Sequence, residues 1–190
     1  MIITLSGITG IGKSYFKKQI QEKLGIPIQT IITTREKRSG EIDGVDKKFV
    51  TDKEFEELKR KKEIIVTFEM LGYKYGYPTK KMKSDENSVV ELHYSIIYQL
   101  KKEVENTFSI YIIPKDIEIA KQKLKERRLP KKIEKDRLIE IEEHIKNFKT
   151  NNDLRKQFDY IFYNDYTENS VNELINVIKN ICAKQDKILY

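Results

Sequence analysis

The residues with the clearest chemical capacity lie near the start of this 190-residue sequence. Gly7 is followed, after four intervening residues, by Gly12, Lys13 and Ser14. Glycines allow backbone N–H groups to turn toward an anion, a lysine in this place reaches nucleotide phosphates, and the serine hydroxyl is a magnesium ligand. The spacing therefore predicts a loop that binds the phosphates of a nucleoside triphosphate.

The segments on either side of this loop supply the context that such a site needs. Residues 2–5 are β-branched or aliphatic, which is typical of a buried strand, and a helical pattern continues through Tyr15, Phe16 and Ile20. The alternative is a tight strand-to-helix turn whose glycines serve packing alone. Lys13 and Ser14 have no packing reason to follow it, and the helix N-terminus favours an anion. We therefore prefer the phosphate-binding interpretation.

Composition excludes several other classes of protein. The sequence has 37 Lys and Arg against 30 Asp and Glu, a net charge of +7. These lysines are spread along the chain, often beside glutamates, and no basic stripe carries interleaved aromatic residues. We expect no nucleic-acid partner, whereas a small anionic substrate suits the charge.

The single cysteine, Cys182, excludes an internal disulfide and a Cys-based metal site, and we interpret it as a small apolar residue on the last helix. No signal peptide or membrane-length apolar run is present. The expectation is one domain in the cytoplasm, without a membrane partner.

Apolar strands alternate with amphipathic helices along the chain, which predicts an α/β fold with a mostly parallel sheet covered on both faces. We expect strands at residues 28–34, 64–68, 89–93, 108–113 and 160–163, and a turn region at 72–78. Helices are expected at 15–24, after the capping box at 51–54, at 96–104, 117–127 and 137–148, and over the apolar stripe at 171–181.

A second constellation follows the strand at 28–34. Arg35 and Arg38 lie three residues apart in a glycine-containing loop, a spacing that suits bidentate capture of a phosphate. Lys47, Lys48 and Tyr75 are further donors. The alternative is a solvated charged loop with local ion pairs. Together with the first loop, this one predicts two phosphorylated substrates brought end to end.

A third group of basic residues flanks Pro130. It contains Lys123, Arg127, Arg128 and Arg137. Arginines on a mobile segment over a phosphate site would offset the charge of a transferring phosphoryl group. The alternative is the charged end of a helix.

These motifs resemble the guanylate kinase family of P-loop nucleoside-monophosphate kinases, over nearly the whole chain. The resemblance is carried by the ordered residues 33–50, the capping-box helix, Gly72 with Tyr75 and Gly76, the strand at Val89, Arg127 with Arg137, and residues 158–165. It implies a P-loop NTPase-type parallel-sheet core with helices on both faces, a small mixed α/β monophosphate-binding lobe, and a lid. The implied ranges are 1–32, 81–125 and 138–190 for the core, 33–80 for the lobe and 126–137 for the lid.

The resemblance also assigns roles to individual residues. It implies ATP binding by Gly7, Thr9, Gly10, Ile11, Gly12, Lys13, Ser14 and Asn164, the last near the adenine. It implies acceptor-phosphate binding by Arg35, Arg38, Tyr75 and Lys47, and catalytic roles for Lys13, Arg127 and Arg137. Ser14 would bind Mg²⁺ directly. Glu91 would lie behind the groups that bind the ion and would not bind it itself.

The sequence departs from the family where guanine is read. The family's hydroxyl or carboxylate groups are replaced by Ile31, Val66, Tyr77 and His93. Elsewhere, Lys47 stands for a phosphate-contacting tyrosine, and Ile8-Thr9 for a Pro-Ser pair. His93 is either a new base contact or a residue that only fills the site. The other histidine, His144, is expected on a polar helix face, so a zinc site is not predicted.

The expected activity is ATP-dependent phosphoryl transfer to a nucleoside monophosphate, with GMP the family default and a weak preference among bases. The protein would be a monomer or homodimer. One alternative is a kinase for another phosphorylated small molecule such as a sugar bisphosphate. Another is a non-catalytic interaction module of the same fold.

Overall fold

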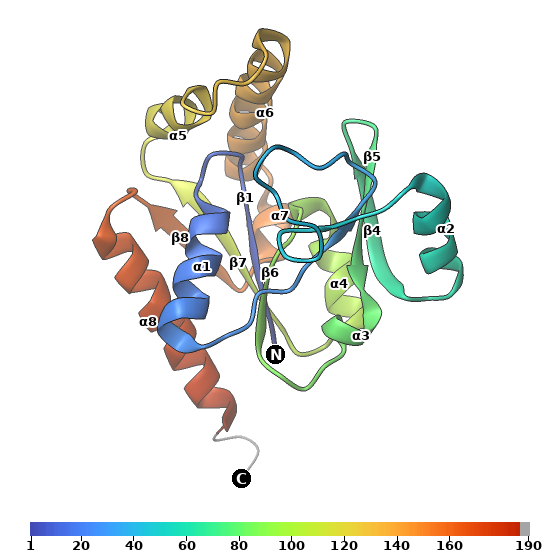
Figure 1. Ribbon diagram of the computed structural model, residues 1–190. Helices are drawn as coiled ribbons and strands as arrows, with labels where there is room; N and C mark the ends of the chain where they lie inside the picture. Colours follow the sequence, from blue (N-terminus) through green and yellow to red (C-terminus); the bar gives the residue numbers. More distant parts are fainter. Residues whose placement is uncertain (187–190) are drawn as a thin grey trace. The chain divides into compact units, whose positions relative to one another are not determined.

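The computed structural model describes residues 1–186, and strands alternate with helices along them (Figure 1). The strands are β1 (Ile2–Gly7), β2 (Ile32–Thr33), β3 (Lys48–Phe49), β4 (Ile64–Met70), β5 (Tyr73–Pro78), β6 (Ser88–Glu91), β7 (Thr107–Pro114) and β8 (Tyr160–Asn164). The helices are α1 (Lys13–Leu24), α2 (Asp52–Arg60), α3 (Thr79–Met82), the 3₁₀ helix η1 (Tyr94–Ile96), α4 (Ile97–Glu103), α5 (Ile117–Lys125), α6 (Lys131–Thr150), α7 (Asn152–Lys156) and α8 (Glu168–Asp186).

The chain divides into two compact units, each built from two separate segments. The first unit contains Met1–Thr4 and Pro27–Phe108, and the second contains Leu5–Ile26 and the chain from residue 109 onward. The range 33–80 expected for the acceptor lobe lies in the first unit, and the range 126–137 expected for the lid lies in the second. The expected core segment 138–190 runs past the described residues at its last four positions.

The central sheet has the strand order β6-β1-β7-β8. Strands β7 and β8 run parallel, and their pairing ends with Pro114 opposite Asn164. On β1 the consecutive side chains of Ile2 and Ile3, and then Leu5, are buried. Burial of successive residues is typical of a parallel strand that is covered on both faces. The predicted P-loop NTPase-type parallel-sheet fold is confirmed.

The second sheet lies within the first unit and has the order β3-β2-β5-β4. Strands β4 and β5 form an antiparallel hairpin, joined at Leu71 (φ 53°) and Gly72 (φ 77°). Two left-handed residues in a two-residue loop match the twist of the strands that they join. The turn region predicted at 72–78 is therefore wrong, because the tyrosines at 73, 75 and 77 alternate along a strand.

Helix α2 covers one face of this second sheet. Its predicted capping box is present: the Thr51 hydroxyl accepts from the Glu54 N–H at 3.2 Å, and the Glu54 carboxylate accepts from the Thr51 N–H at 2.7 Å. Phe55 on α2 packs with Ile32 and Ile64 in a small apolar core. These contacts tie α2 to the sheet that carries the residues expected to bind the acceptor.

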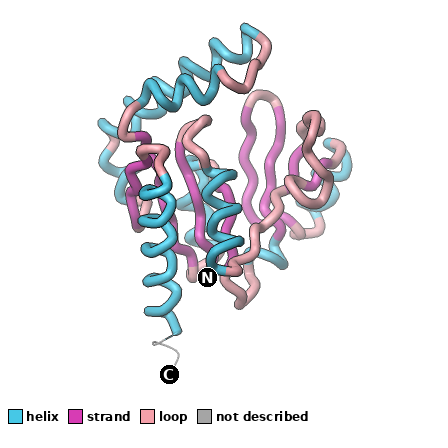
Figure 2. Tube along the Cα trace, turned by 60° about the vertical axis from the view of Figure 1, so that its left-hand side comes forward, coloured by secondary structure: helices cyan, strands magenta, loops and turns pink. Residues whose placement is uncertain are grey.

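In the second unit, α1 and α8 lie side by side (Figure 2). Lys23 near the end of α1 donates to the Glu168 carboxylate at 3.0 Å, and Phe16 meets the edge of Phe162 on β8 at 5.8 Å. Helix α1 ends at Leu24, the last residue of the expected range 15–24, and is followed by left-handed Gly25, whose N–H donates to the Gln21 carbonyl. The helix that begins in the glycine loop is thus anchored along its length.

Three expectations about local structure need correction. The strand expected at 28–34 is confined to Ile32–Thr33, with a single bridge between Ile28 and Val89. The helix expected to begin at residue 137 begins at Lys131, because Pro130 occupies its N-cap, where the missing N–H of proline carries no cost. The expected lid segment therefore includes the first turns of α6.

The third correction concerns His144, which is buried and not on a polar face. Its ring meets that of Tyr111 edge-on at 5.7 Å.

Within the described residues, no group of three His, Cys, Asp or Glu side chains is placed to hold a metal ion. No helix there is long and apolar enough to cross a membrane.

Candidate active site

The glycine loop between β1 and α1 combines a backbone that favours glycine with contacts too close for a Cβ. Gly7 has φ +146°, and a Cβ there would lie 2.4 Å from the Ile112 carbonyl oxygen. Gly10 has φ +81°, and a Cβ there would lie 2.8 Å from the Ala120 carbonyl oxygen. At both positions φ is positive, and the backbone of another segment of the same chain lies too close for a Cβ. The loop is therefore held against β7 and α5 in one conformation.

Lys13 folds back over this loop. Its ammonium donates to the carbonyl oxygens of Gly7 and Ile8, each at 2.9 Å. Gly12 forms the N-cap of α1, so Lys13 and exposed Ser14 begin the helix. The ammonium and the serine hydroxyl thus lie at the loop, beside the positive end of a helix, where a phosphate chain would be favoured.

Asn164, at the end of β8, supports the loop from behind. Its side-chain amide donates to the Ile11 carbonyl at 3.0 Å, and its side-chain oxygen accepts from the Tyr166 N–H at 2.8 Å. The side chain is buried. The structure therefore gives Asn164 a role in positioning the loop, and the expected contact with adenine stays a prediction.

Arg35 is held by local contacts in the first unit. Its guanidinium donates to both oxygens of Glu41, at 2.7 and 3.0 Å, and to the Glu36 carbonyl at 2.6 Å. Its side chain is 8% exposed and its guanidinium carbon lies 5.5 Å from the centre of the Phe49 ring. The alternative of a local ion pair is thus present for Arg35, although the arginine itself is buried and not solvated.

Glu41 is a residue that the sequence analysis did not assign to the site. Its carboxylate also accepts from the Arg38 N–H at 2.8 Å, so it organises the backbone between the two arginines. Burial raises the pKa of Glu41, but the hydrogen bonds from Arg35 and Arg38 outweigh it and hold that pKa below its ordinary value. The carboxylate stays charged at neutral pH and keeps the arginine loop in shape.

The residues expected at the acceptor base fall into two groups. Tyr77 and His93 come together, whereas Ile31 and Val66 are both buried and bring no polar side-chain atom. The Tyr77 hydroxyl donates to the Glu91 carbonyl at 3.1 Å, and burial raises the pKa of Tyr77. This bond also fixes the backbone at Glu91, the residue expected near magnesium.

The organising residue of this group is Phe68, which the sequence analysis missed. Its ring stacks with Tyr75 at 4.8 Å and 13°, and with His93 at 4.8 Å and 18°. Tyr77 is its third ring neighbour, at 6.4 Å. The alternation of side chains along a strand could have predicted it. Phe68 lies two positions after Val66 on β4, and residues two apart share a face of the sheet.

The other expected phosphate ligands are less closely grouped. Lys47 is half-buried just before β3, and Tyr75 is buried on β5 opposite Thr33. In the second unit, Arg127 is exposed in the connection between α5 and α6. Arg137 lies inside α6 and forms an ion pair with Glu140.

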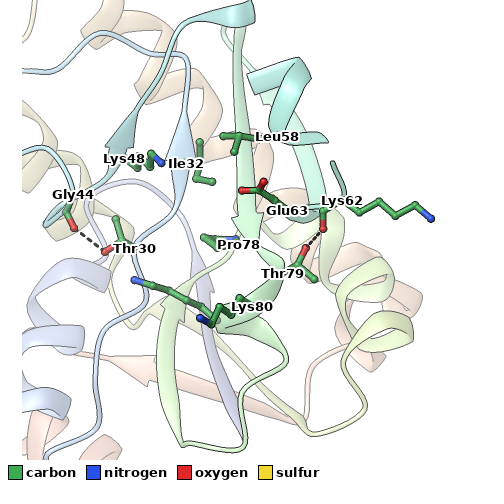
Figure 3. A pocket seen from close by; sticks show the side chains of 11 residues that line it. Thr30, Ile32, Gly44, Lys48, Leu58, Lys62, Glu63, Pro78, Thr79 and Lys80 are labelled. Carbon is green, nitrogen blue, oxygen red and sulfur yellow. Dashed lines mark hydrogen bonds between the residues drawn. The ribbon is translucent and has the colours of Figure 1, made fainter. Parts of the chain in front are cut away.

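A cavity of about 610 Å³ lies on the other face of the second sheet (Figure 3). Ile32, Leu58 and Pro78 form its apolar wall, and Lys48, Lys80 and Lys81 line it with their stems. Ile32 pairs with Gly76 and Thr33 pairs with Tyr75, so the cavity and the aromatic rings lie on opposite faces. Lys48, considered above as a further phosphate donor, lines this cavity, whereas the residues that the resemblance assigns to the acceptor site are not among its lining residues.

Comparison with known proteins identifies the family of the chain. The sequence model of the family "Guanylate kinase" matches residues 1–181. A guanylate kinase of Thermus thermophilus is 28% identical over 183 residues, covering 93% of this chain and 80% of the relative. A guanylate kinase of Oceanobacillus iheyensis is 24% identical over 193 residues, covering 99% and 91%.

Solved structures agree on the fold. The crystal structure of guanylate kinase from Anaplasma phagocytophilum superposes with a TM-score of 0.70 at 24% identity, covering 97% of this chain and 85% of that one. A shikimate kinase from Bacteroides thetaiotaomicron gives a TM-score of 0.52 at 14% identity, covering 96% and 98%.

The fold and the glycine loop with its lysine and serine define a P-loop kinase. The chain belongs to the guanylate kinase family, and its enzyme class is that of the nucleoside-monophosphate kinases.

Proposed function

We propose that the protein transfers the γ-phosphoryl group of ATP to the phosphate of a nucleoside monophosphate. The observation that carries this proposal is the glycine loop with Lys13 folded over it, its ammonium 2.9 Å from two loop carbonyls. When a nucleotide enters, phosphate oxygens would replace these carbonyls as acceptors. Lys13 would then hold the β- and γ-phosphates in line for transfer.

The residues present fit a magnesium complex of ATP. Carbonyl oxygens of β7 and α5 leave no room for a Cβ at Gly7 and Gly10, so these glycines fix the shape of the loop, whose backbone N–H groups would bind the phosphate chain. Ser14 is exposed at the first turn of α1, where its hydroxyl would ligate Mg²⁺, and Glu91 would lie beyond the direct ligands. Bound Mg²⁺ neutralises charge on the β- and γ-phosphates.

On the acceptor side, Arg35 and Arg38 would aim the monophosphate, with Tyr75 and Lys47 as further donors. Glu41 holds Arg35 in its buried position, so the guanidinium is oriented before substrate arrives. A guanidinium carries five N–H donors, more than the bonds to Glu41 and Glu36 use. We propose residues 33–80 as the acceptor lobe and residues 126–137 as the lid.

The lid arginines would act on the transferring group. Arg127 is exposed on a short connection and Arg137 lies on α6, so each needs to reach the phosphates when the site is filled. A guanidinium near the equatorial oxygens of a transferring phosphoryl group stabilises the charge that spreads over them. No covalent intermediate is required.

The test is turnover by the purified protein with Mg·ATP and a panel of nucleoside and sugar phosphates, read by chromatography of the products. We expect at least one nucleoside monophosphate to be converted to its diphosphate. Lys13→Ala should lower kcat by at least about a hundredfold, since it removes a group that stabilises the transition state. Lys18→Ala, an exposed lysine on the same helix, is the matched control and should retain turnover.

Two outcomes would count against the proposal. Wild-type turnover by Lys13→Ala would show that the glycine loop does not organise the reacting phosphates. Conversion of a sugar phosphate alone, with every nucleoside monophosphate inert, would move the activity to another acceptor class.

A further inference from the structure

We propose that Phe68 determines the acceptor. Its ring and the rings stacked with it fill the base end of the acceptor site, so the site takes monophosphates with a single-ring pyrimidine base and rejects purines. This inference rests on the proposed phosphoryl transfer to nucleoside monophosphates and names the substrate class for that reaction.

The position of Phe68 follows from its contacts. It stacks with Tyr75, the tyrosine expected at the acceptor phosphate, and with His93, one of the residues expected at the base. Tyr77, also expected at the base, is its third ring neighbour. A side chain that touches three expected acceptor-site residues lies among them, in space that a larger base would need.

The ring cannot easily move aside. Its two stacking partners are nearly parallel to it, at 13° and 18°, with centroids 4.8 Å away in both cases. Tyr75 and Tyr77 are 6% and 0% exposed, so they have no free space to retreat into. The ring of His93 in turn lies 4.6 Å from that of Tyr94, tilted by 32°, which extends the row of rings. Turning Phe68 out would break these contacts and expose apolar surface to water.

Two polar groups beside Phe68 are engaged within the protein. The Tyr77 hydroxyl donates to the Glu91 carbonyl, and Nδ1 of His93 is bonded to the Ser95 hydroxyl at 2.8 Å. Ile31 and Val66 have no polar side-chain atoms. A purine edge buried here would give up hydrogen bonds to water without replacing them, and guanine has the most such groups to lose.

A pyrimidine base fits the space beside Phe68 better than a purine does. Its single ring needs less volume and buries fewer polar atoms, and it can lie against the half-buried edge of the Phe68, His93 and Tyr94 row. Contact with aromatic faces tolerates different bases, so size and not hydrogen-bond reading makes the choice. Discrimination between UMP, CMP and dTMP should accordingly be small.

The experiment compares kcat/KM for UMP, CMP, AMP and GMP, together with binding of each monophosphate by calorimetry in the absence of ATP. In the wild type we expect UMP and CMP to exceed both purines by at least about tenfold in kcat/KM and in affinity. Phe68→Ala should raise the ratio of GMP to UMP by at least about tenfold, because it empties the space that a second ring needs.

Two controls separate selectivity from stability. Phe68→Leu keeps much of the bulk and should keep the wild-type preference. Tyr73→Ala removes an exposed ring from the same hairpin and should change neither selectivity nor turnover. Thermal unfolding of each variant shows whether it folds.

The wild-type measurement decides even if Phe68→Ala does not fold. Equal or better use of GMP or AMP by the wild type overturns the proposal, as does binding of no monophosphate. An unchanged purine ratio in folded Phe68→Ala also overturns it. If the monophosphates bind with the expected selectivity but none is phosphorylated, the assignment of Phe68 stands while the proposed function fails.

Discussion

The amide of Asn164 donates a hydrogen bond of 3.0 Å to the carbonyl oxygen of Ile11, and so joins the end of β8 to the glycine loop. The two residues are 153 positions apart in the sequence. The C-terminal ends of β1 and β8 lie at the same edge of the sheet, and ligands of open α/β sheets bind at that edge. The shape of the loop therefore depends on a strand near the end of the chain.

Replacing Asn164 by alanine should loosen this loop. The Ile11 carbonyl would lose its buried partner, which costs about 1–3 kcal/mol of unfolding free energy. We also expect a KM for ATP raised about tenfold, with the KM for the acceptor nearly unchanged. Thermal unfolding and steady-state kinetics measure the two effects. Asn180→Ala, on the exposed face of α8, is the control; a normal KM for ATP in Asn164→Ala would show that the bond does not shape the loop.

Two glycines with nearly the same φ, Gly10 in the glycine loop and Gly40 in the arginine loop, separate the cost of backbone strain from that of a steric clash. Gly10→Ala puts a Cβ 2.8 Å from the Ala120 carbonyl oxygen at φ +81°. Gly40 has nearly the same φ, +83°, with nothing within 4 Å of its Cβ position. We expect Gly40→Ala to cost about 1 kcal/mol of stability and Gly10→Ala at least about 3 kcal/mol. Denaturant unfolding measures both, and equal losses would refute a close packing of the loop on α5.

The carboxylate of Glu41 should matter for the acceptor and not for the donor nucleotide. Glu41→Gln keeps the shape but removes the charge that holds Arg35, so we expect the KM for the acceptor to rise about tenfold with the KM for ATP unchanged. Glu36→Gln is the control, because only the backbone carbonyl of Glu36 contacts Arg35. A rise in both KM values would indicate general loss of structure.

The stability of the second unit should depend on pH through Asp165. Hydrogen bonds from Ser170, Thr167 and Lys115 hold the pKa of this carboxyl well below its ordinary value of 3.8. Because the folded pKa is lowered, the contribution is complete above the unfolded pKa and is lost as pH falls below about 4. Urea midpoints measured from pH 7 downward should fall more steeply for the wild type than for Asp165→Asn. Identical slopes would mean that this carboxylate does not stabilise the fold.

Much of the fold could be predicted because local chemistry and tertiary packing agree there. The strand, loop and helix at the start, the capping box at Thr51 and the stop at Gly25 each depend on neighbouring residues. The hairpin of β4 and β5 was missed because Gly72 and the tyrosines suggested a turn, whereas pairing with β2 makes them a strand. The helix expected at 137–148 was placed too late, because Pro130 proved to be a helix start.

The candidate site divides in the same way. Lys13 and Ser14 follow from motif spacing, because a phosphate loop is a local structure. Glu41 and Phe68 act through contacts with residues elsewhere in the lobe, which spacing alone does not reveal. His144 was misplaced because the two residues before it, Glu142 and Glu143, are charged. Its ring instead lies on the buried face of α6 and meets Tyr111.

The central claim is that the γ-phosphoryl group of ATP passes to the phosphate of a nucleoside monophosphate, and that Lys13 holds the β- and γ-phosphates during this transfer. It is tested most directly with ATP labelled with ¹⁸O in the γ-phosphate, incubated with Mg²⁺, protein and a mixture of nucleoside monophosphates, followed by mass spectrometry. The account predicts label in the terminal phosphate of a nucleoside diphosphate with the wild type, and labelling at least about a hundredfold slower with Lys13→Ala. Label found only in inorganic phosphate, or equal transfer by Lys13→Ala, would contradict it.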